Sequence, residues 1–128
     1  MKLIAPEQLS KAWPRVEAWI SEAVKVNQGD ENLLDVLIAI ARGHYLLFEG
    51  PTFAVVGQVQ PHPQQTVGMI LYCGGSDMAG IAQGFEEGKQ WCKANGISVM
   101  RTFGRPGWAK VLDLMPAGVI LQINLKES

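Results

Sequence analysis

The sequence predicts an α/β (α+β) domain in which a central, mostly antiparallel mixed sheet is flanked by helices. Three short segments rich in β-branched and aromatic residues follow one another between residues 44 and 73, which is typical of an antiparallel meander. Residues 66–103 then show the pattern strand, glycine turn, helix and strand, which indicates a βαβ unit. A length of 128 residues fits one domain spanning 1–128.

Two helices are expected before the first strong strand, and a short strand at 2–4 is compatible with the pattern. Because proline is best tolerated in the first turn of a helix, Pro14 predicts a short turn at 6–12 and the main helix at 14–26. The second helix carries apolar side chains at helical spacing, and Gly43 is placed to end it.

The remaining chain alternates strands and helices. The three meander strands are separated by proline-containing turns and are expected at 44–49, 52–60 and 66–73. The elements expected after them are a helix from Met78 to about Asn95, a strand at 97–103, a short helix at 106–115 and a strand at 119–126. The predicted order is therefore (β)ααβββαβαβ.

Gly84 and Gly88 lie one turn apart inside the helix that begins at Met78. A glycine inside a helix costs about 1 kcal/mol relative to alanine. A close approach of the backbone to the sheet, or to another chain, is expected to compensate for this cost. Packing within the chain is the usual reason in soluble proteins.

Composition and charge exclude several classes of function. The net charge is −1 and the basic residues are scattered, so the basic patch that nucleic-acid binding needs is missing. No run approaches the ~20 apolar residues of a membrane span, and the first residues lack the apolar core of a signal peptide, so we expect a cytoplasmic protein. Cys73 and Cys92 are expected as thiols, and with His44 and His62 they show no metal-site spacing.

The expected element order resembles the GNAT superfamily, the GCN5-related N-acetyltransferases, across nearly the whole chain. In that family the acetyl-CoA pyrophosphate lies at the start of the helix after the fourth strand, in a loop patterned Gln/Arg-x-x-Gly-x-Gly/Ala. In the matching run here, Gly80 and Ala82 agree, whereas Asp77 replaces the basic or amide residue. A helix N-terminus attracts phosphate, but a carboxylate repels it. Ser76 and Asp77 are therefore interpreted either as N-caps or as ligand contacts.

The resemblance implies a site for acetyl-CoA or CoA, without a metal. Backbone N–H groups of the glycine turn and of the first helical turn would hold the pyrophosphate, and the end of the strand at 66–73 would pair with the pantetheine arm. An amine would attack the thioester directly, with no covalent enzyme intermediate. The cofactor-binding residues implied in this way are Cys73, Gly74, Gly75, Ser76, Met78, Ala79, Gly80 and Ala82.

The catalytic residues stay unknown at this stage. The family often uses a tyrosine in a pattern like Asn-x-x-Ala-x-x-x-Tyr to protonate the departing thiolate, and aligning on Ala109 puts Asp113 at that tyrosine's position. Tyr72 is the tyrosine nearest the motif, but an aromatic residue in a half-buried strand more often serves packing. A base needs hydrogen-bond reach to its substrate, and the carboxylates considered for that role are Glu49, Asp77 and Asp113.

Three short motifs resemble the small GNAT-like proteins of tailed bacteriophages and prophages. They are Trp13-Pro14-Arg15-Val16, Tyr72-Cys73-Gly74-Gly75 and Gly104-Arg105-Pro106-Gly107-Trp108. In the last motif the glycines and the proline indicate a tight turn before a helix, and Trp108 is expected in the core. Arg105 has two interpretations, as part of that turn or as a fixed positive charge that meets an anionic ligand or partner.

Two hypotheses of different classes follow from this resemblance. The first is a CoA-binding protein that transfers an acyl group to an amine. The second is a non-catalytic phage interaction or assembly protein that retains the scaffold and binds a phage protein partner. A homodimer is compatible with both hypotheses, and association with the virion is compatible with the second.

Overall fold

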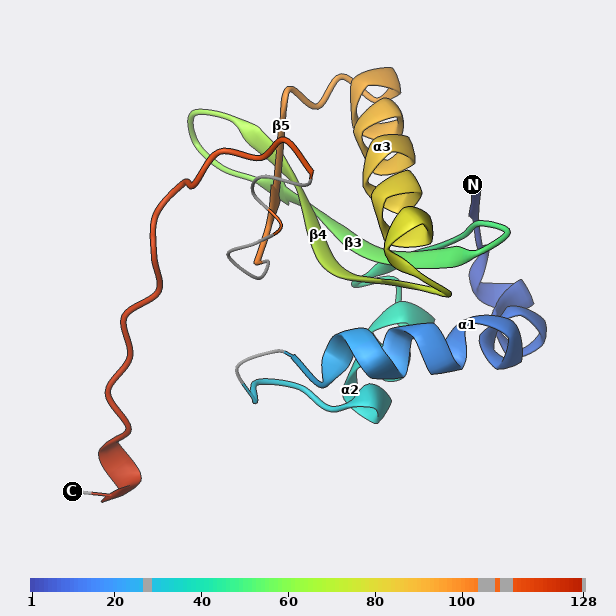
Figure 1. Cartoon of the computed structure of the whole chain (residues 1–128), viewed down its shortest axis with the longest axis horizontal. Helices are drawn as coiled ribbons and strands as arrows, with labels where there is room; N and C mark the ends of the chain where they lie inside the picture. The colour runs from blue at the N-terminus through green and yellow to red at the C-terminus, as the bar shows by residue number, and fades with distance from the viewer. Residues whose placement is uncertain (27–28, 104–107, 109–111, 128) are drawn as a thin grey trace.

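A computed structural model of the chain describes residues 1–26, 29–103, 108 and 112–127. Helices α1 (Leu9–Val24) and α2 (Leu33–Ala41) lie on one side of a five-stranded sheet, and α3 (Met78–Ala94) lies on the other (Figure 1). The predicted α/β class is confirmed. Within the described residues no helix is both long and apolar enough to cross a membrane.

The sheet order follows the chain order. Its strands are β1 (Lys2–Leu3), β2 (Leu46–Glu49), β3 (Phe53–Pro61), β4 (Thr66–Gly75) and β5 (Val99–Thr102). The first four pair antiparallel, and β5 pairs parallel to β4 because α3 connects them. The predicted mixed, mostly antiparallel sheet is therefore confirmed, although β5 is shorter than the expected 97–103.

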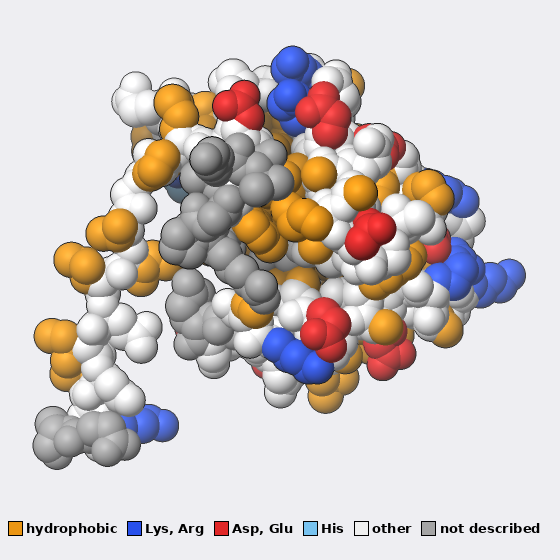
Figure 2. Space-filling view, in the orientation of Figure 1, with side chains coloured by type: hydrophobic (Ala, Val, Ile, Leu, Met, Phe, Trp, Pro, Cys, Tyr) orange, Lys and Arg blue, Asp and Glu red, His pale blue; other side chains and the backbone are white. Residues whose placement is uncertain are grey.

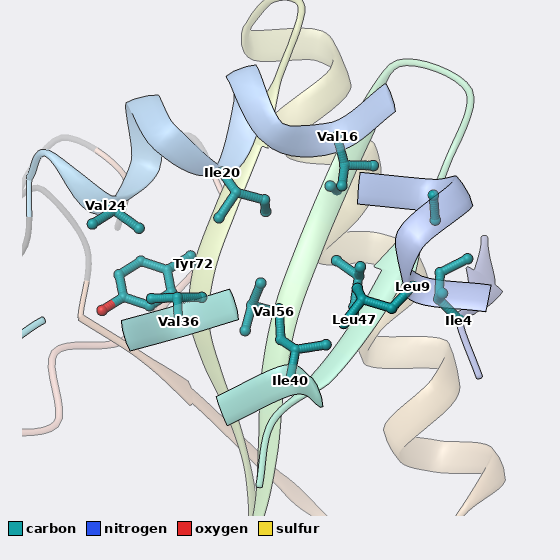
Figure 3. Packing of buried hydrophobic residues seen from close by; sticks show 12 residues of the cluster. Ile4, Leu9, Val16, Ile20, Val24, Val36, Ile40, Leu47, Val56 and Tyr72 are labelled. Carbon is teal, nitrogen blue, oxygen red and sulfur yellow. The ribbon is translucent and has the colours of Figure 1, made fainter. Parts of the chain in front are cut away.

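The two faces of the sheet carry separate hydrophobic clusters. Val16, Ile20 and Val24 of α1 point toward the sheet and belong to one cluster with Val56 of β3 and Tyr72 of β4 (Figure 3). The opposite cluster lies beneath α3 around Phe53, which is fully buried. Both faces of the central strands are thus covered, which explains why β3 begins with an unbroken run of buried residues.

Helix α1 begins at Leu9, after a 3₁₀ turn at Pro6–Gln8, so the prediction that it starts at 14 is wrong. Leu9 and Ala12 are buried and continue the apolar stripe of the helix toward its N-terminus. Pro14 lies inside the helix on its exposed side. The burial of the first turns offsets the cost of an interior proline, which sequence rules alone weigh more heavily.

The C-terminal part of the chain differs most from the prediction. Residues 106–107 and 109–111 of the expected helix at 106–115 lie outside the described residues, while Leu112 donates its N–H to the Trp108 carbonyl at 2.8 Å. The predicted strand at 119–126 is not formed, and a 3₁₀ turn at Leu125–Glu127 is the regular structure found there. A strand requires a paired neighbour, and this segment leads away from the sheet (Figure 1).

Strand β4 contains a β-bulge near its centre. Val56 of β3 pairs with Tyr72 and Gly57 pairs with Ile70, so Leu71 is the extra residue. The pairs between β4 and β5 end at Ile70 and Thr102. The end of β4 beyond the bulge therefore continues without a β5 partner in the described part of the chain, and this open end positions the candidate site.

Candidate functional site

A cavity of about 600 Å³ opens where β4 and β5 separate. The last residues of β4, from Leu71 to Gly75, form one wall, and Met78 and Ile81 of α3 form another. Thr102 at the end of β5 closes a third side. Ligand pockets in proteins measure about 300–1,000 Å³, so the cavity is large enough for a small organic ligand or part of a larger one.

The structure brings only some of the predicted cofactor-binding residues to this cavity. Cys73, Gly74, Gly75 and Met78 are among its described lining residues. The others lie beside it, in the turn or in the first turns of α3, and they are Ser76, Ala79, Gly80 and Ala82. Arg105, the candidate anion contact, lies outside the described residues.

The start of α3 is capped by its own chain. Oδ1 of Asp77 accepts a hydrogen bond from the Gly80 N–H at 2.8 Å, which is the geometry of an N-cap. The Ser76 N–H donates to the Thr52 carbonyl at 2.9 Å. Between the two interpretations of Asp77, the structure thus favours the cap. An α-helix leaves its first N–H groups without intrahelical acceptors, and in α3 these include Met78 and Ala79.

Backbone packing explains the glycines of the motif. A Cβ on Gly74 would lie 2.1 Å from the Trp19 carbonyl oxygen of α1. A Cβ on Gly80 would lie 2.7 Å from the Thr52 carbonyl oxygen, and one on Gly75 would lie 2.8 Å from the same atom. Each contact is with backbone, which cannot move aside easily. These glycines are therefore required by the fold, whether or not a ligand approaches them.

Cys73 lines the cavity but is not suited to act as a nucleophile. Burial raises the pKa of its thiol to about 12, and the Sγ atom lies 3.6 Å from the Ile81 carbonyl oxygen. The nucleophilic form of cysteine is the thiolate, which is scarce at neutral pH when the pKa is this high. Cys73 and Cys92 are both free and buried.

A hydrogen-bonded group that the sequence analysis missed lies at the cavity. The carboxylate of Glu31 accepts hydrogen bonds from the hydroxyl groups of Tyr72 and Tyr45, each at 2.7 Å. Figure 3 shows the Tyr72 ring in the core below α1. Burial, and secondly the hydrogen bond to Glu31, raise the pKa of Tyr45 to about 12. All three residues are among the described lining of the cavity.

No local sequence signal joins these three residues. Glu31 lies between α1 and α2, Tyr45 precedes β2, and Tyr72 lies in β4. Tyr72 was predicted to serve packing, and its ring does pack in the core, but its hydroxyl group also reaches a carboxylate. Glu31 directly follows a turn-forming Gly-Asp pair, so the sequence predicts only that it lies in a loop. Loops often contain binding and catalytic residues.

The three carboxylates considered as bases do not line the cavity in its described part. Glu49 is engaged by Arg15, whose Nε and Nη2 donate to it at 2.7 and 2.8 Å, and this hydrogen bond holds the pKa of Glu49 below its usual value. Asp77 caps α3, and Asp113 lies in an exposed turn with φ 54°. Among the described residues, no group of three potential metal ligands is found.

No protein-family model matches this sequence, and no curated protein matches it either. Solved structures do match. A predicted acetyltransferase of Clostridium acetobutylicum, solved with acetyl-CoA, is 14% identical and has a TM-score of 0.62, with 99% of this chain and 96% of that chain covered.

Two aminoglycoside acetyltransferases show the same likeness. The enzyme meta-AAC0020, from an uncultured soil metagenomic sample and solved with sisomicin, is 8% identical with a TM-score of 0.63, with 96% of this chain and 91% of that chain covered. The enzyme AAC(6')-Iy, solved with CoA, is 10% identical with a TM-score of 0.63 over the same shares of the two chains. At such identities the likeness shows the fold and not the activity. The chain therefore has the GNAT-like fold of these acetyltransferases.

Proposed function

We propose that the protein binds acetyl-CoA or a related acyl-CoA and transfers the acyl group to an amine. The observation that carries this proposal is the end of β4, from Leu71 to Gly75, which has no partner on its β5 side in the described part of the chain and forms a wall of the 600 Å³ cavity beside the N-terminus of α3. A free strand edge offers backbone N–H and C=O groups at regular spacing, and the pantetheine arm carries two amides that match such an edge.

The start of α3 fits the pyrophosphate of the same ligand. The N–H groups of Met78 and Ala79 and the positive end of the helix dipole favour an anion there. Because the Gly80 N–H already donates to Asp77, the contacts to phosphate come from fewer donors than the family pattern implies. We therefore expect a weaker pyrophosphate site than the pattern implies, in which Ser76 and Ala79 flank the ligand.

The acceptor amine would bind on the Glu31 side of the cavity. The described lining there carries three carboxylates, those of Glu22, Asp30 and Glu31, and no lysine or arginine. In the transfer step the amine nitrogen attacks the thioester carbonyl carbon, and Glu31 takes the proton that the nitrogen loses. The C–S bond then breaks, and the CoA thiolate leaves and takes a proton from solvent. General bases of this kind typically accelerate such steps about 10²- to 10⁴-fold.

The binding step is tested by titration calorimetry of the nucleotide-free protein with CoA and acetyl-CoA. We expect micromolar or tighter binding that Ala79→Glu weakens at least tenfold, because a carboxylate beside the helix N-terminus repels the pyrophosphate. Ala79→Gln is the matched control, since it adds the same bulk without charge at this exposed position. Gly80→Glu is unsuitable, because its Cβ would collide with the Thr52 backbone whether or not ligand is present.

The catalytic step is tested by thiol release from acetyl-CoA with a panel of primary amines. Glu31→Gln keeps an oxygen that can accept from a tyrosine hydroxyl group but removes the base, so we expect the rate to fall at least 100-fold while CoA affinity changes less than twofold. An unchanged rate in a folded Glu31→Gln variant would exclude Glu31 as the base and leave the binding proposal intact.

A second candidate is the non-catalytic interaction or assembly protein of a phage or prophage. The cap at Asp77 favours it, because the loop geometry is complete without a ligand. Under this proposal, millimolar CoA would give neither heat nor thermal stabilisation. The phage origin and the phage partner rest on the short sequence motifs, and a binding screen against the other proteins of the same phage or prophage is the test.

A further inference from the structure

Glu31 lies in a loop, but contacts hold both its backbone and its side chain. It directly precedes Asn32, the N-cap of α2, which exchanges two hydrogen bonds of 2.9 Å with Asp35 in a capping box. Its carboxylate accepts one hydrogen bond at each oxygen, from the Tyr72 hydroxyl group at Oε1 and from the Tyr45 hydroxyl group at Oε2. Two donors on different oxygens set the plane of the carboxylate, so two distant parts of the chain determine its orientation.

The two tyrosine rings are themselves held in place. Tyr72 of β4 is buried in the cluster beneath α1, and Figure 3 shows its hydroxyl oxygen pointing away from Val56. Tyr45 packs against the same cluster just before β2, and its backbone N–H donates to the Ala39 carbonyl at 3.2 Å. A supporting side chain positions its partner only when packing and hydrogen bonds fix its own rotamer. Both tyrosines meet this condition.

Hydroxyl donors orient a carboxylate without adding positive charge. The hydrogen bond from Arg15 lowers the pKa of Glu49, and a carboxylate with a lowered pKa is a weaker base. A protonated tyrosine hydroxyl group is neutral. Burial, and secondly the hydrogen bond to Glu31, raise the pKa of Tyr45 to about 12, so this hydroxyl group keeps its proton at neutral pH. Tyr45 therefore remains a donor under the conditions in which a base is needed.

The other two carboxylates of the described cavity lining are more exposed. Glu22 is exposed and pairs with Lys25 at 2.8 Å, and Asp30 is exposed as well. Exposed ion pairs hold their side chains weakly. They are also common on this surface, since Figure 2 shows acidic side chains beside basic ones at several places. Among these three carboxylates, Glu31 is the one that buried or half-buried hydroxyl groups orient.

We propose that Tyr45 and Tyr72 are positioning residues of the acyl transfer, which hold the Glu31 carboxylate in the orientation that accepts the amine proton. The inference rests on the proposed function, in which Glu31 is the base. The tyrosines exchange no proton in the step: the proton passes from the amine nitrogen to Glu31, and both hydroxyl groups stay donors. Removing them leaves the base present but misplaced, and a misplacement of about 1 Å can slow a reaction about 10²-fold.

NMR at neutral pH tests the contact without reference to activity. The chain contains two tyrosines, so protein labelled with carbon-13 at the tyrosine Cζ atom gives two signals. Tyr45→Phe and Tyr72→Phe each remove one signal and so assign it. We expect Glu31→Gln to move both, because a hydrogen bond to a carboxylate polarises a hydroxyl group more than one to an amide. Glu22→Gln, the control, removes the same charge from the same cavity and should move neither. Signals that stay in place in Glu31→Gln would overturn the proposal.

Steady-state kinetics with acetyl-CoA and a primary amine test the role. We expect Tyr45→Phe and Tyr72→Phe each to lower kcat about tenfold and to change the KM for acetyl-CoA by about twofold at most, because the rings and the cavity wall remain. In the Glu31→Gln background the same two substitutions should change kcat by about twofold at most, because no base is left to position.

The outcomes separate this inference from the proposed function. If the wild type turns over and the two phenylalanine variants match its kcat, the positioning role is overturned and the proposed function stands. Equal losses of kcat in the wild-type and Glu31→Gln backgrounds would also overturn the positioning role, because they would show that the tyrosines act through the fold and not through Glu31. A wild type that binds acetyl-CoA but releases no thiol with any amine would overturn the transfer reaction, and the positioning role with it.

Discussion

Single side chains join parts of this molecule that are far apart in the sequence. Tyr72 and Glu31 are 41 positions apart, yet their side chains meet at 2.7 Å. Arg15 and Glu49, 34 positions apart, meet through two hydrogen bonds and tie α1 to β2. The first pair lies at the cavity and the second on the surface, so we expect the first to affect ligand chemistry and the second to affect stability alone.

Glu49→Gln should lower stability at neutral pH by at most about 1 kcal/mol, because the ion pair is largely exposed on the Arg15 side and screened by water. The hydrogen bond from Arg15 lowers the pKa of Glu49 in the folded state. The pair therefore contributes stability above the pKa of an unfolded-state glutamate, and this contribution is lost as the pH falls through the folded-state value.

The measurement is urea unfolding of the wild type and Glu49→Gln between pH 7 and about pH 3. The difference in unfolding free energy should shrink toward zero at the acid end. Glu17→Gln, at an exposed site of α1, is the control and should show a smaller difference at pH 7. A difference that grows with acidity would contradict the assignment.

At the scale of elements, buried glycines of α3 let its backbone approach the sheet closely. The expectation that Gly84 and Gly88 allow a close approach is confirmed, since both are buried against the sheet. A Cβ on Gly84 would lie 2.9 Å from Sγ of Cys73 and 3.0 Å from the Phe53 ring. A Cβ on Gly88 would meet the end of the Ile70 side chain at 3.2 Å, and that end can move.

Gly84→Ala and Gly88→Ala should therefore differ, although both remove the same helix penalty of about 1 kcal/mol. Gly84→Ala overpacks a rigid part of the core and is expected to destabilise by about 1–3 kcal/mol. Gly88→Ala is expected to be neutral or slightly stabilising. Thermal and urea unfolding of the two variants check this, and equal destabilisation would mean that the Ile70 side chain is held as firmly as the Phe53 ring.

At the scale of the whole molecule, the cavity lies between elements from different parts of the chain. Helix α1, the end of β4, the start of α3 and the end of β5 all contribute walls. A ligand that fills this space holds those elements together, so binding and global stability are linked. The cavity thus offers a way to detect a ligand without knowledge of the reaction.

Acetyl-CoA at 100 times its dissociation constant should stabilise the fold by about 2.7 kcal/mol, which corresponds to a rise in Tm on the order of 10 °C. Differential scanning fluorimetry with CoA, acetyl-CoA and ATP separates the contributions of the acyl-pantetheine arm and the nucleotide. ATP alone should give a smaller shift, because it lacks the arm that pairs with β4. Equal shifts in Tm for all three ligands would mean that the phosphates supply the binding free energy and that the pantetheine arm adds little.

The sequence predicted most of the elements because each depends on local patterns. The helical spacing of apolar residues in α2, the glycine after its end and the alternation in the strands all act within a few residues. The prediction for the start of α1 was wrong because the burial of Leu9, which is a tertiary effect, outweighed the effect of Pro14. The strand at 119–126 was predicted from its alternation alone, without regard to whether a neighbour was available.

The candidate site was harder to predict for the same reason. Cys73 to Met78 could be placed near a helix N-terminus, because strand, turn and helix are contiguous there. The contact of Glu31 with Tyr45 and Tyr72 depends on how α1 and α2 sit on the sheet, which no local pattern contains. The competition of Asp77 for the Gly80 N–H could be foreseen only as one of two alternatives.

The bulge at Leu71 determines which face of the sheet each later side chain of β4 points to. Ile70 and Tyr72 are two positions apart and would normally share a face, yet Ile70 packs beneath α3 and Tyr72 packs beneath α1. Deleting Leu71 would remove the bulge and make Ile70 and Tyr72 neighbours on opposite faces, so the Tyr72 hydroxyl group would stay on the Glu31 side of the sheet and Cys73 would stay beneath α3. A regular strand of the same sequence would place Tyr72 on the face of Ile70, away from Glu31, so the contact between Tyr72 and Glu31 depends on a backbone irregularity and not on the choice of side chains alone.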